Sequence, residues 1–346
     1  MSRRPARAPR QPRVLAVIVA VAATMLAGAC TAAGAYDPTP LYTPPPPAAP
    51  SPSPTATASP APSGTDIATT NCLQSYSPPA TMPEPGSMPA GSTMDRIRKR
   101  GRLIAGVSSD TLLLGARNPV TGRIEGFDID MLRAVSQAIF GDPDKVELKV
   151  ITAAQRLPSL EDGTVDIVAR NMTITCARWK EIAFSSEYYR SGQKVLVRLG
   201  EKTEDGGPIR GIDDLAGKKV CAPNGSTSMD KLRTFTDIEA VGADTHTGCL
   251  VLFQQGSVDG ITGDDTVLAG LAAQDPYADV VQAQAFTAEP YGLGVNAKNV
   301  DFVRFVNGVL ARMRADGQWT KSYNTWLADS LGKAPAPPQP VYGRAP

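Results

Sequence analysis

Between residues 93 and 331, apolar and polar positions alternate in a pattern that predicts strands and helices in turn. The run RLIAGV predicts a strand at 102–107, directly after a basic helix that ends at Gly101. In FDIDMLRAVSQAIFG, an apolar stripe recurs at helical spacing: Ile129, Leu132, Val135 and Ile139. VELKVI alternates as a strand does, a helix that ends at Gly163 follows, and VDIVAR predicts another strand. Such alternation favours an α/β fold on a largely parallel sheet.

One sequence pattern occurs twice. LEDGTVDIVARN in the first half is echoed by FQQGSVDGITGD in the second, and each predicts a helix, a glycine stop and a strand with a polar end. Chance recurrence of a common αβ unit is the alternative. We expect two α/β lobes, the first (93–195, with a return segment 290–331) interrupted by the second (196–289), and joined near Gln193–Leu199 and Tyr291–Asn296. The polar ends at 171–178 and 263–265 should then face one another across a ligand cleft.

The first 92 residues are different in kind. Five arginines precede an apolar run at 14–29, which is shorter than the roughly 20 residues of a membrane span and predicts a secretory signal peptide at 1–29. Its end, LAGAC, resembles a bacterial lipoprotein signal and implies lipidation of Cys30, although Leu26 lies four rather than three residues before the cysteine. Ordinary secretion and twin-arginine export through Arg3-Arg4 are the alternatives. Sixteen of the 31 prolines fall between Tyr36 and Pro89, so residues 30–92 predict an extended tether, and 332–346 a disordered tail.

Charge and cysteine content restrict the function further. The formal net charge of +1 is spread evenly, which argues against a nucleic-acid-binding protein. Four cysteines follow Cys30, an even number that suggests two disulfides in an exported protein. Three pairings are possible, and we favour Cys221–Cys249 within one lobe and Cys72–Cys176 between the tether and the other lobe.

The two polar strand ends carry side chains suited to a zwitterion. Arg178 offers a planar fork of donors for a carboxylate, with the hydroxyls of Thr173 and Thr175 nearby. Ser226 and Thr227 stand where a helix should begin, so they predict either an anion site or plain N-capping. Of Asp264 and Asp265, one should be the N-cap of the helix that follows, which leaves the other for a cation. A carboxylate grip on one side and an ammonium grip on the other describe an α-amino acid.

The chain resembles the extracytoplasmic solute-binding proteins of the polar amino-acid family, the receptors of ABC importers. The resemblance covers about 102–328 and rests on ordered pieces that include GFDIDMLRAV, the run MTIT..R, FSSEYY, GDDTVLAG and YGLGVN. It is most marked with actinobacterial lipoproteins named as glutamine- or glutamate-binding. It implies a two-lobed, type II periplasmic-binding-protein-like fold that is lipid-anchored on the outer face of the membrane. It also implies a monomer without a cofactor, an amino-acid ligand, and an ABC permease or a membrane sensor as partner.

Position by position, the resemblance implies a ligand set. Arg178 would hold the α-carboxylate with N–H groups near Thr173 and at Ser226–Thr227. Asp264 would hold the α-ammonium with the Thr173 hydroxyl and the Asn171 carbonyl. Aromatic residues that sandwich the ligand in some relatives have no counterpart, since Leu112 and Ala153 lie near those positions, and Ser108 replaces a common aspartate.

For the ligand's side chain we propose Arg156 and Arg170, with Ser108 and Arg117 behind them. A pair of arginines would favour aspartate or glutamate, while glutamine and asparagine stay possible. Arg156 lies in a predicted helix, where exposure to solvent is the alternative that we favour.

Other function classes are weaker. A dehydratase-type enzyme on the same fold is the less favoured alternative, because the sequence has no Ser-His-Asp, Cys-His or metal cluster. His246, the only histidine, is expected at the surface. A nutrient sensor would use the same site as an importer subunit, so the sequence does not separate them. A scaffold without a ligand leaves the polar strand ends unexplained.

Overall fold

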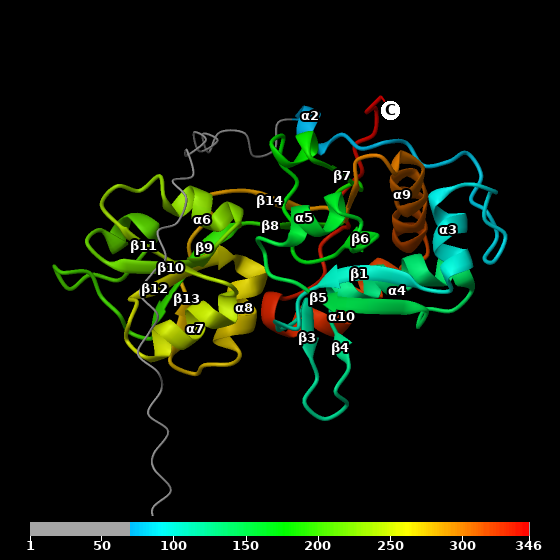
Figure 1. Ribbon diagram of the computed structural model, residues 1–346. Coiled ribbons are helices and arrows are strands. Elements are labelled where there is room, and N and C mark those ends of the chain that lie inside the picture. Colours follow the sequence, from blue (N-terminus) through cyan, green and yellow to red (C-terminus); the bar gives the residue numbers. More distant parts are fainter. Residues whose placement is uncertain (1–69, 346) are drawn as a thin grey trace, which may run out of the picture. The chain divides into compact units, whose positions relative to one another are not determined.

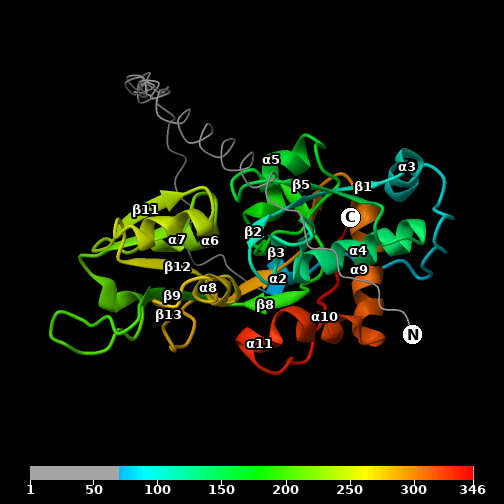
Figure 2. The same ribbon diagram turned by 90° about the horizontal axis from the view of Figure 1, so that it is seen from below.

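The computed structural model describes residues 70–345, which lie within one compact unit of the chain. Their elements form two lobes, each with its own five-stranded sheet (Figures 1 and 2). The predicted signal peptide, Cys30 and the tether up to residue 69 lie outside the described residues. Between residues 70 and 345, none of the helices combines the length and the apolar character that a membrane span requires.

The first lobe is built on a sheet with the strand order β5-β1-β6-β15-β7. β1 pairs in parallel with β5 and β6, whereas β15 is antiparallel to β6 and β7. These strands are β1 (Leu103–Val107), β5 (Val146–Val150), β6 (Ile167–Val168), β7 (Ile182–Phe184) and β15 (Gly294–Asn296). A small sheet accompanies them, made of β2 (Asp110–Thr111), β3 (Gly115–Arg117) and β4 (Ile124–Glu125). The helices are α3 (Thr93–Arg100), α4 (Phe127–Phe140), α5 (Arg156–Glu161), η1 (Arg178–Lys180), α9 (Val300–Ala315), α10 (Gln318–Trp326) and α11 (Ala328–Leu331).

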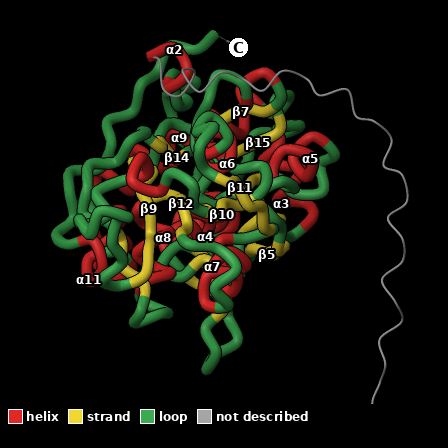
Figure 3. The backbone as a smooth tube through the Cα atoms, turned by 90° about the vertical axis from the view of Figure 1, so that its left-hand side faces the viewer, coloured by secondary structure: helices red, strands yellow, loops and turns green. Residues whose placement is uncertain are grey.

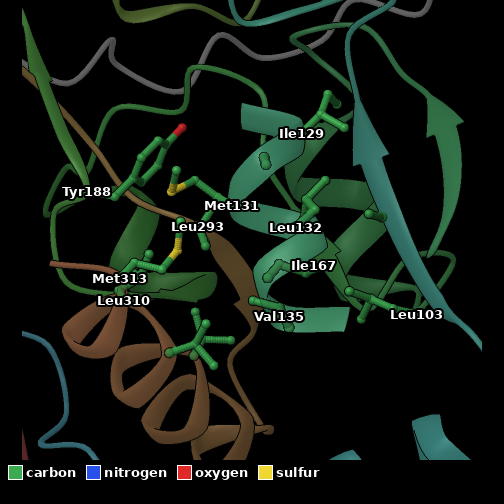
Figure 4. Packing of buried hydrophobic residues seen from close by; sticks show 14 of the residues in the cluster. Leu103, Ile129, Met131, Leu132, Val135, Ile167, Tyr188, Leu293, Leu310 and Met313 are labelled. Atoms are coloured by element: carbon green, nitrogen blue, oxygen red, sulfur yellow. The ribbon is translucent and has the colours of Figure 1, made fainter. Parts of the chain in front are cut away.

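Helix α4 follows from the spacing of its apolar residues. All four residues of its predicted stripe are at most 1% exposed: Ile129, Leu132, Val135 and Ile139. They belong to the same core cluster as Leu103 and Ile167 of the sheet (Figure 4). Burial of one such side chain contributes about 1.5–3 kcal/mol, so this face fixes the helix to the strands. The helix ends at Gly141, whose φ of 74° favours glycine.

The second lobe has a sheet with the order β11-β10-β12-β9-β13. Figure 3 labels four of these strands, β11, β10, β12 and β9. β10 is parallel to β11 and β12, whereas β9 is antiparallel to β12 and β13. The elements are β9 (Gln193–Arg198), η2 (Ile212–Leu215), β10 (Lys219–Pro223), α6 (Thr227–Leu232), β11 (Glu239–Ala243), α7 (His246–Gln254), β12 (Gly260–Asp264), α8 (Asp265–Ala272) and β13 (Ala278–Val280). A disulfide between Cys221 and Cys249 joins β10 to α7, as predicted.

Two short antiparallel strands connect the lobes: β8 (Tyr189–Ser191) and β14 (Glu289–Tyr291). The predicted connectors near Gln193–Leu199 and Tyr291–Asn296 were wrong, because most of these residues form β9 of the second sheet and β15 of the first. The second lobe therefore begins with β9, slightly before residue 196. Each true connector has three residues, too few to produce a periodic pattern in the sequence.

The segments that flank the lobes pack against the first lobe. After α2 (Thr70–Leu73), the buried Ser75 hydroxyl donates to the Phe184 carbonyl at 2.8 Å. Tyr342 forms a parallel β-bridge with Ser75, and the Arg344 guanidinium stacks over the Trp179 ring at 3.7 Å. The tether therefore does not extend to residue 92, and the tail up to residue 345 is not detached. Their prolines disfavour long regular elements but leave backbone and side chains able to form hydrogen bonds with a neighbouring surface.

Candidate functional site

The polar ends of the two sheets meet at a glycine of the second lobe. The Gly225 carbonyl accepts from Nη2 of Arg156 at 3.0 Å and from Nη2 of Arg178 at 3.3 Å, and both arginines belong to the first lobe. Gly225 has a φ of 71°, and a Cβ there would lie 2.7 Å from the Cα of Ala154. A larger residue would therefore push the lobes apart at this point.

Arg156 is buried at the junction of the lobes and is not exposed to solvent. Its side chain is only 2% exposed, so the prediction of a solvent-exposed residue was wrong. It begins α5 and also donates through Nη1 to the carbonyls of Arg170 and Asn171, both at 3.2 Å. Helical spacing could not reveal that Arg156 is buried, because the second lobe covers this side of the first turn of α5. Burial, followed by the positive charges of Arg178 and Arg170, lowers the pKa of Arg156.

The turn after β6 is held in an uncommon conformation. Asn171 has a φ of 37°, a region that non-glycine residues rarely adopt. Its backbone N–H donates to Oδ2 of Asp128 at 2.8 Å, and Oδ1 of Asp128 accepts from the Tyr188 hydroxyl at 2.6 Å. Burial raises the pKa of Asp128 to about 6. Oδ1 of Asn171 is buried and has no hydrogen-bond partner within residues 70–345.

Arg178 and Thr173 lie together on the first lobe. Nη1 of Arg178 donates to the Thr173 carbonyl at 2.8 Å, and the side chain is 8% exposed. The Arg178 N–H donates to the Thr175 hydroxyl at 3.1 Å, which starts the short helix η1. A disulfide between Cys72 and Cys176 pins this loop to the N-terminal segment, as predicted.

On the second lobe, the structure separates residues whose roles the sequence left open. The Ser226 hydroxyl accepts from the Met229 N–H at 3.0 Å, which is plain N-capping of α6. Thr227 instead turns its hydroxyl to Glu289 of β14, at 2.8 Å. Asp265 accepts from the Ser191 hydroxyl, whereas Asp264 takes the N-cap position of α8 without making a side-chain cap.

Asp264 faces the junction of the lobes. Its Oδ2 accepts from the Tyr291 hydroxyl at 2.5 Å, while Oδ1 is buried and has no partner in the described part of the chain. The residue is 3% exposed. Burial, and next the nearby Glu289 carboxylate, raise the pKa of Asp264. A cation placed at Oδ1 would relieve both effects.

A second polar group lies around Arg170. Its side chain is 3% exposed and donates through Nε to the Ile151 carbonyl at 2.8 Å. Asp110 and Asp128 are the carboxylates that act on it most strongly. Ser108 is buried and donates to Asp110 at 2.8 Å, which places it at the edge of this group. Arg117 does not join them, because it is exposed and donates to Gly122.

His246 is not a surface residue, contrary to expectation. It is 7% exposed, and a Cβ on Gly263 would lie 2.5 Å from its Nε2. That nitrogen has no hydrogen-bond partner among the described residues. Burial, and next the charge of Arg170, lower the pKa of His246 to about 3. The prediction failed because a polar loop sequence was interpreted as exposed. Helix α7 begins at His246, and the neighbouring Thr247 hydroxyl donates to the Asp110 carbonyl of the first lobe at 3.0 Å.

Sequence reasoning also missed Glu289 and Gln193. Glu289 is fully buried on a connecting strand, and Gln193 stands opposite Asp264 in the β9–β12 ladder with a buried, unpartnered Oε1. No clear signal in the sequence marked them, because Gln193 lies between a glycine and a lysine, and Glu289 follows a threonine and an alanine in a polar stretch.

Comparisons with known proteins agree with this architecture. The model of the bacterial extracellular solute-binding proteins, family 3, matches residues 103–329. The ABC transporter glutamine-binding protein GlnH of Bacillus subtilis is 32% identical over 239 residues, which cover 68% of this chain and 85% of that protein. The glutamate-binding protein GluB of Corynebacterium efficiens is 30% identical, covering 72% and 85%.

Solved structures lead to the same fold. An ancestral arginine-binding protein bound to glutamine superposes with a TM-score of 0.61 at 29% identity, covering 68% of this chain and 99% of that one. A receptor for L-cysteine from Neisseria gonorrhoeae gives a TM-score of 0.64 at 25% identity, covering 70% and 96%. The fold is therefore the two-lobed periplasmic-binding-protein fold, and the chain belongs to the bacterial extracellular solute-binding proteins, family 3.

Proposed function

We propose that the protein binds a polar or acidic L-α-amino acid between its lobes, with Arg178 on the α-carboxylate and Asp264 on the α-ammonium. The observation that carries this proposal is a set of buried charges without ion pairs. Arg156, Arg170 and Arg178 form no ion pair within 4.0 Å among residues 70–345, and neither does Asp264. Buried charges are costly unless they are paired, and a zwitterion would pair them.

The ligand's side chain would extend toward Arg170 and His246. Arg156 supports this orientation, because it interacts electrostatically with Arg178 and Asp264 as well as with Arg170. Two buried guanidinium groups favour a carboxylate over an amide, so glutamate and aspartate are the preferred candidates. A neutral His246 could instead accept from an amide, which keeps glutamine and asparagine as the alternative.

Delivery to an ABC permease fits the printed names of the relatives, among them the ABC transporter glutamine-binding protein of Bacillus subtilis. In this proposal Cys30 carries the lipid that anchors the protein outside the cell membrane. A membrane sensor remains a second candidate partner, since it would use the same ligand and the same closed lobes.

The test is a calorimetric titration of the purified protein with the twenty amino acids. We expect tight binding of an acidic or amide amino acid in the wild type and loss of binding in Arg178→Ala. Arg210→Ala, which changes an exposed arginine of the second lobe, serves as the matched control. No binding by any amino acid, or unchanged affinity in Arg178→Ala, would refute the proposal.

A further inference from the structure

Glu289 is a buried carboxylate whose hydrogen bonds within residues 70–345 all come from hydroxyl donors. Oε2 accepts from Thr173 of the first lobe at 2.6 Å and from Thr227 of the second lobe at 2.8 Å. Oε1 accepts from Thr287 at 2.6 Å. The side chain is 0% exposed and forms no ion pair within 4.0 Å in the described part of the chain.

These hydrogen bonds determine whether the two threonine hydroxyls can donate to a ligand or only accept from it. A hydroxyl has one proton to donate and two lone pairs that accept. Thr173 and Thr227 direct their protons at Glu289, so each hydroxyl oxygen retains only acceptor capacity. The two oxygens lie 3.3 Å apart, which makes them a pair of acceptors at the junction of the lobes.

The unpartnered oxygen of Asp264 adds a third acceptor in the same region. Burial, and next the Glu289 carboxylate, raise the pKa of Asp264, which agrees with a position of the two acids near one another. Tyr291 links them through the chain, since it lies two residues after Glu289 on β14 and donates to Asp264. This arrangement offers acceptors without a free hydroxyl donor.

We propose that Glu289 is a positioning residue that holds the Thr173 and Thr227 hydroxyls as acceptors and thereby selects ligands with an ammonium at this point. It acts through the threonines. The inference rests on the proposed function and goes beyond it, because it assigns the rejection of deaminated analogues to a residue on the connecting strand. A 2-hydroxy acid offers one donor in place of three, and a 2-oxo acid offers none.

The experiment compares wild type, Glu289→Gln and the matched control Glu239→Gln, which changes an exposed glutamate of the second lobe. Each protein is titrated with the amino acid that binds best in the panel and with its 2-hydroxy and 2-oxo analogues. The glutamine amide can donate to one threonine, which turns that hydroxyl into a donor toward the ligand. We expect the preference for the amino acid over its analogues to fall about tenfold or more in Glu289→Gln, since hydrogen bonds to charged groups are strong, and to stay unchanged in the control.

An unchanged preference in a folded Glu289→Gln variant would overturn this inference and leave the proposed function intact. No binding of any amino acid by the wild type would overturn both. If Glu289→Gln does not fold, Thr227→Val and Thr227→Ser provide the same comparison. The valine variant should lose part of the preference for the ammonium and the serine variant should keep it, and equal preferences in the two would also overturn the inference.

Discussion

At the scale of single residues, two adjacent aspartates show how position decides chemistry. Asp265 is satisfied by Ser191 and by the Thr266 N–H, whereas Asp264 keeps one buried oxygen without a partner. Burial makes the charged form of Asp264 unfavourable in the ligand-free protein. In the proposed function, Asp264 therefore lowers the stability of the ligand-free protein and contributes to binding.

Replacement of Asp264 by asparagine should raise stability and abolish function at once. We expect Asp264→Asn to raise the melting temperature of the ligand-free protein at pH 7, because no buried charge remains. Affinity for the amino acid should fall at least 100-fold, in line with the roughly 3–5 kcal/mol lost when a buried pair loses one partner. Thermal melts and calorimetry measure the two effects. Asp265→Asn is the control, and an equal loss of affinity there would argue against the assignment.

His246 gives a second prediction at this scale. Its pKa falls from the ordinary 6.5 to about 3 on folding, so the folded protein prefers the neutral ring. The stability from this group is present above pH 6.5 and is lost as the pH falls from 6.5 toward 3, by up to about 1.4 kcal/mol per pH unit. Denaturant titrations of wild type and His246→Asn across that window should show a steeper decline in the wild type. Parallel curves would contradict the buried, neutral state.

At the scale of elements, the loop before η1 is held by the N-terminal segment rather than by the sheet of its own lobe. Cys176 lies between Thr173 and Arg178, and its disulfide to Cys72 holds the loop against the N-terminal segment. The Trp179 indole N–H also donates to the Cys72 carbonyl at 2.7 Å. The Cys221–Cys249 disulfide, by contrast, stays inside the second lobe.

The two disulfides should therefore differ in their effect on binding. Either double Cys→Ser variant should lose about 3–5 kcal/mol of stability by the chain-entropy estimate. Only Cys72→Ser/Cys176→Ser should also weaken ligand affinity, because it frees the loop that carries Arg178. Calorimetry at a temperature where both variants are folded provides the comparison. Equal affinities would mean that the loop is held by its other contacts.

At the scale of the whole molecule, the described lobes begin directly after a long proline-rich segment. In our proposal that segment connects them to a lipid on Cys30. Cys30→Ser should move the protein from the membrane fraction to the medium, with ligand affinity unchanged because residue 30 is remote in sequence from every site residue. Fractionation followed by immunoblotting tests this, and a variant that stays in the membrane fraction would favour a different anchor.

The sequence by itself determined the local structure and the family. Helix α4, its glycine stop and the strands on either side followed from periodicity, because apolar spacing reports the face that a single element buries. The family was predicted from motifs in their sequence order, without knowledge of any contact between residues, and the match to the family model confirmed it. The choice of Cys72–Cys176 and Cys221–Cys249 was also correct, although spacing alone allowed three pairings.

Only the tertiary structure decided how the two lobes meet. Arg156 and His246 are buried by elements far away in the chain, and no local pattern records that. The choice between Asp264 and Asp265 depends on Tyr291 and Ser191, which lie on the two connecting strands. The role proposed for Glu289 depends on hydrogen bonds from Thr173 and Thr227, which belong to opposite lobes. Periodicity describes one element against its own core, whereas a site between two lobes is made by contacts between elements that are distant in sequence.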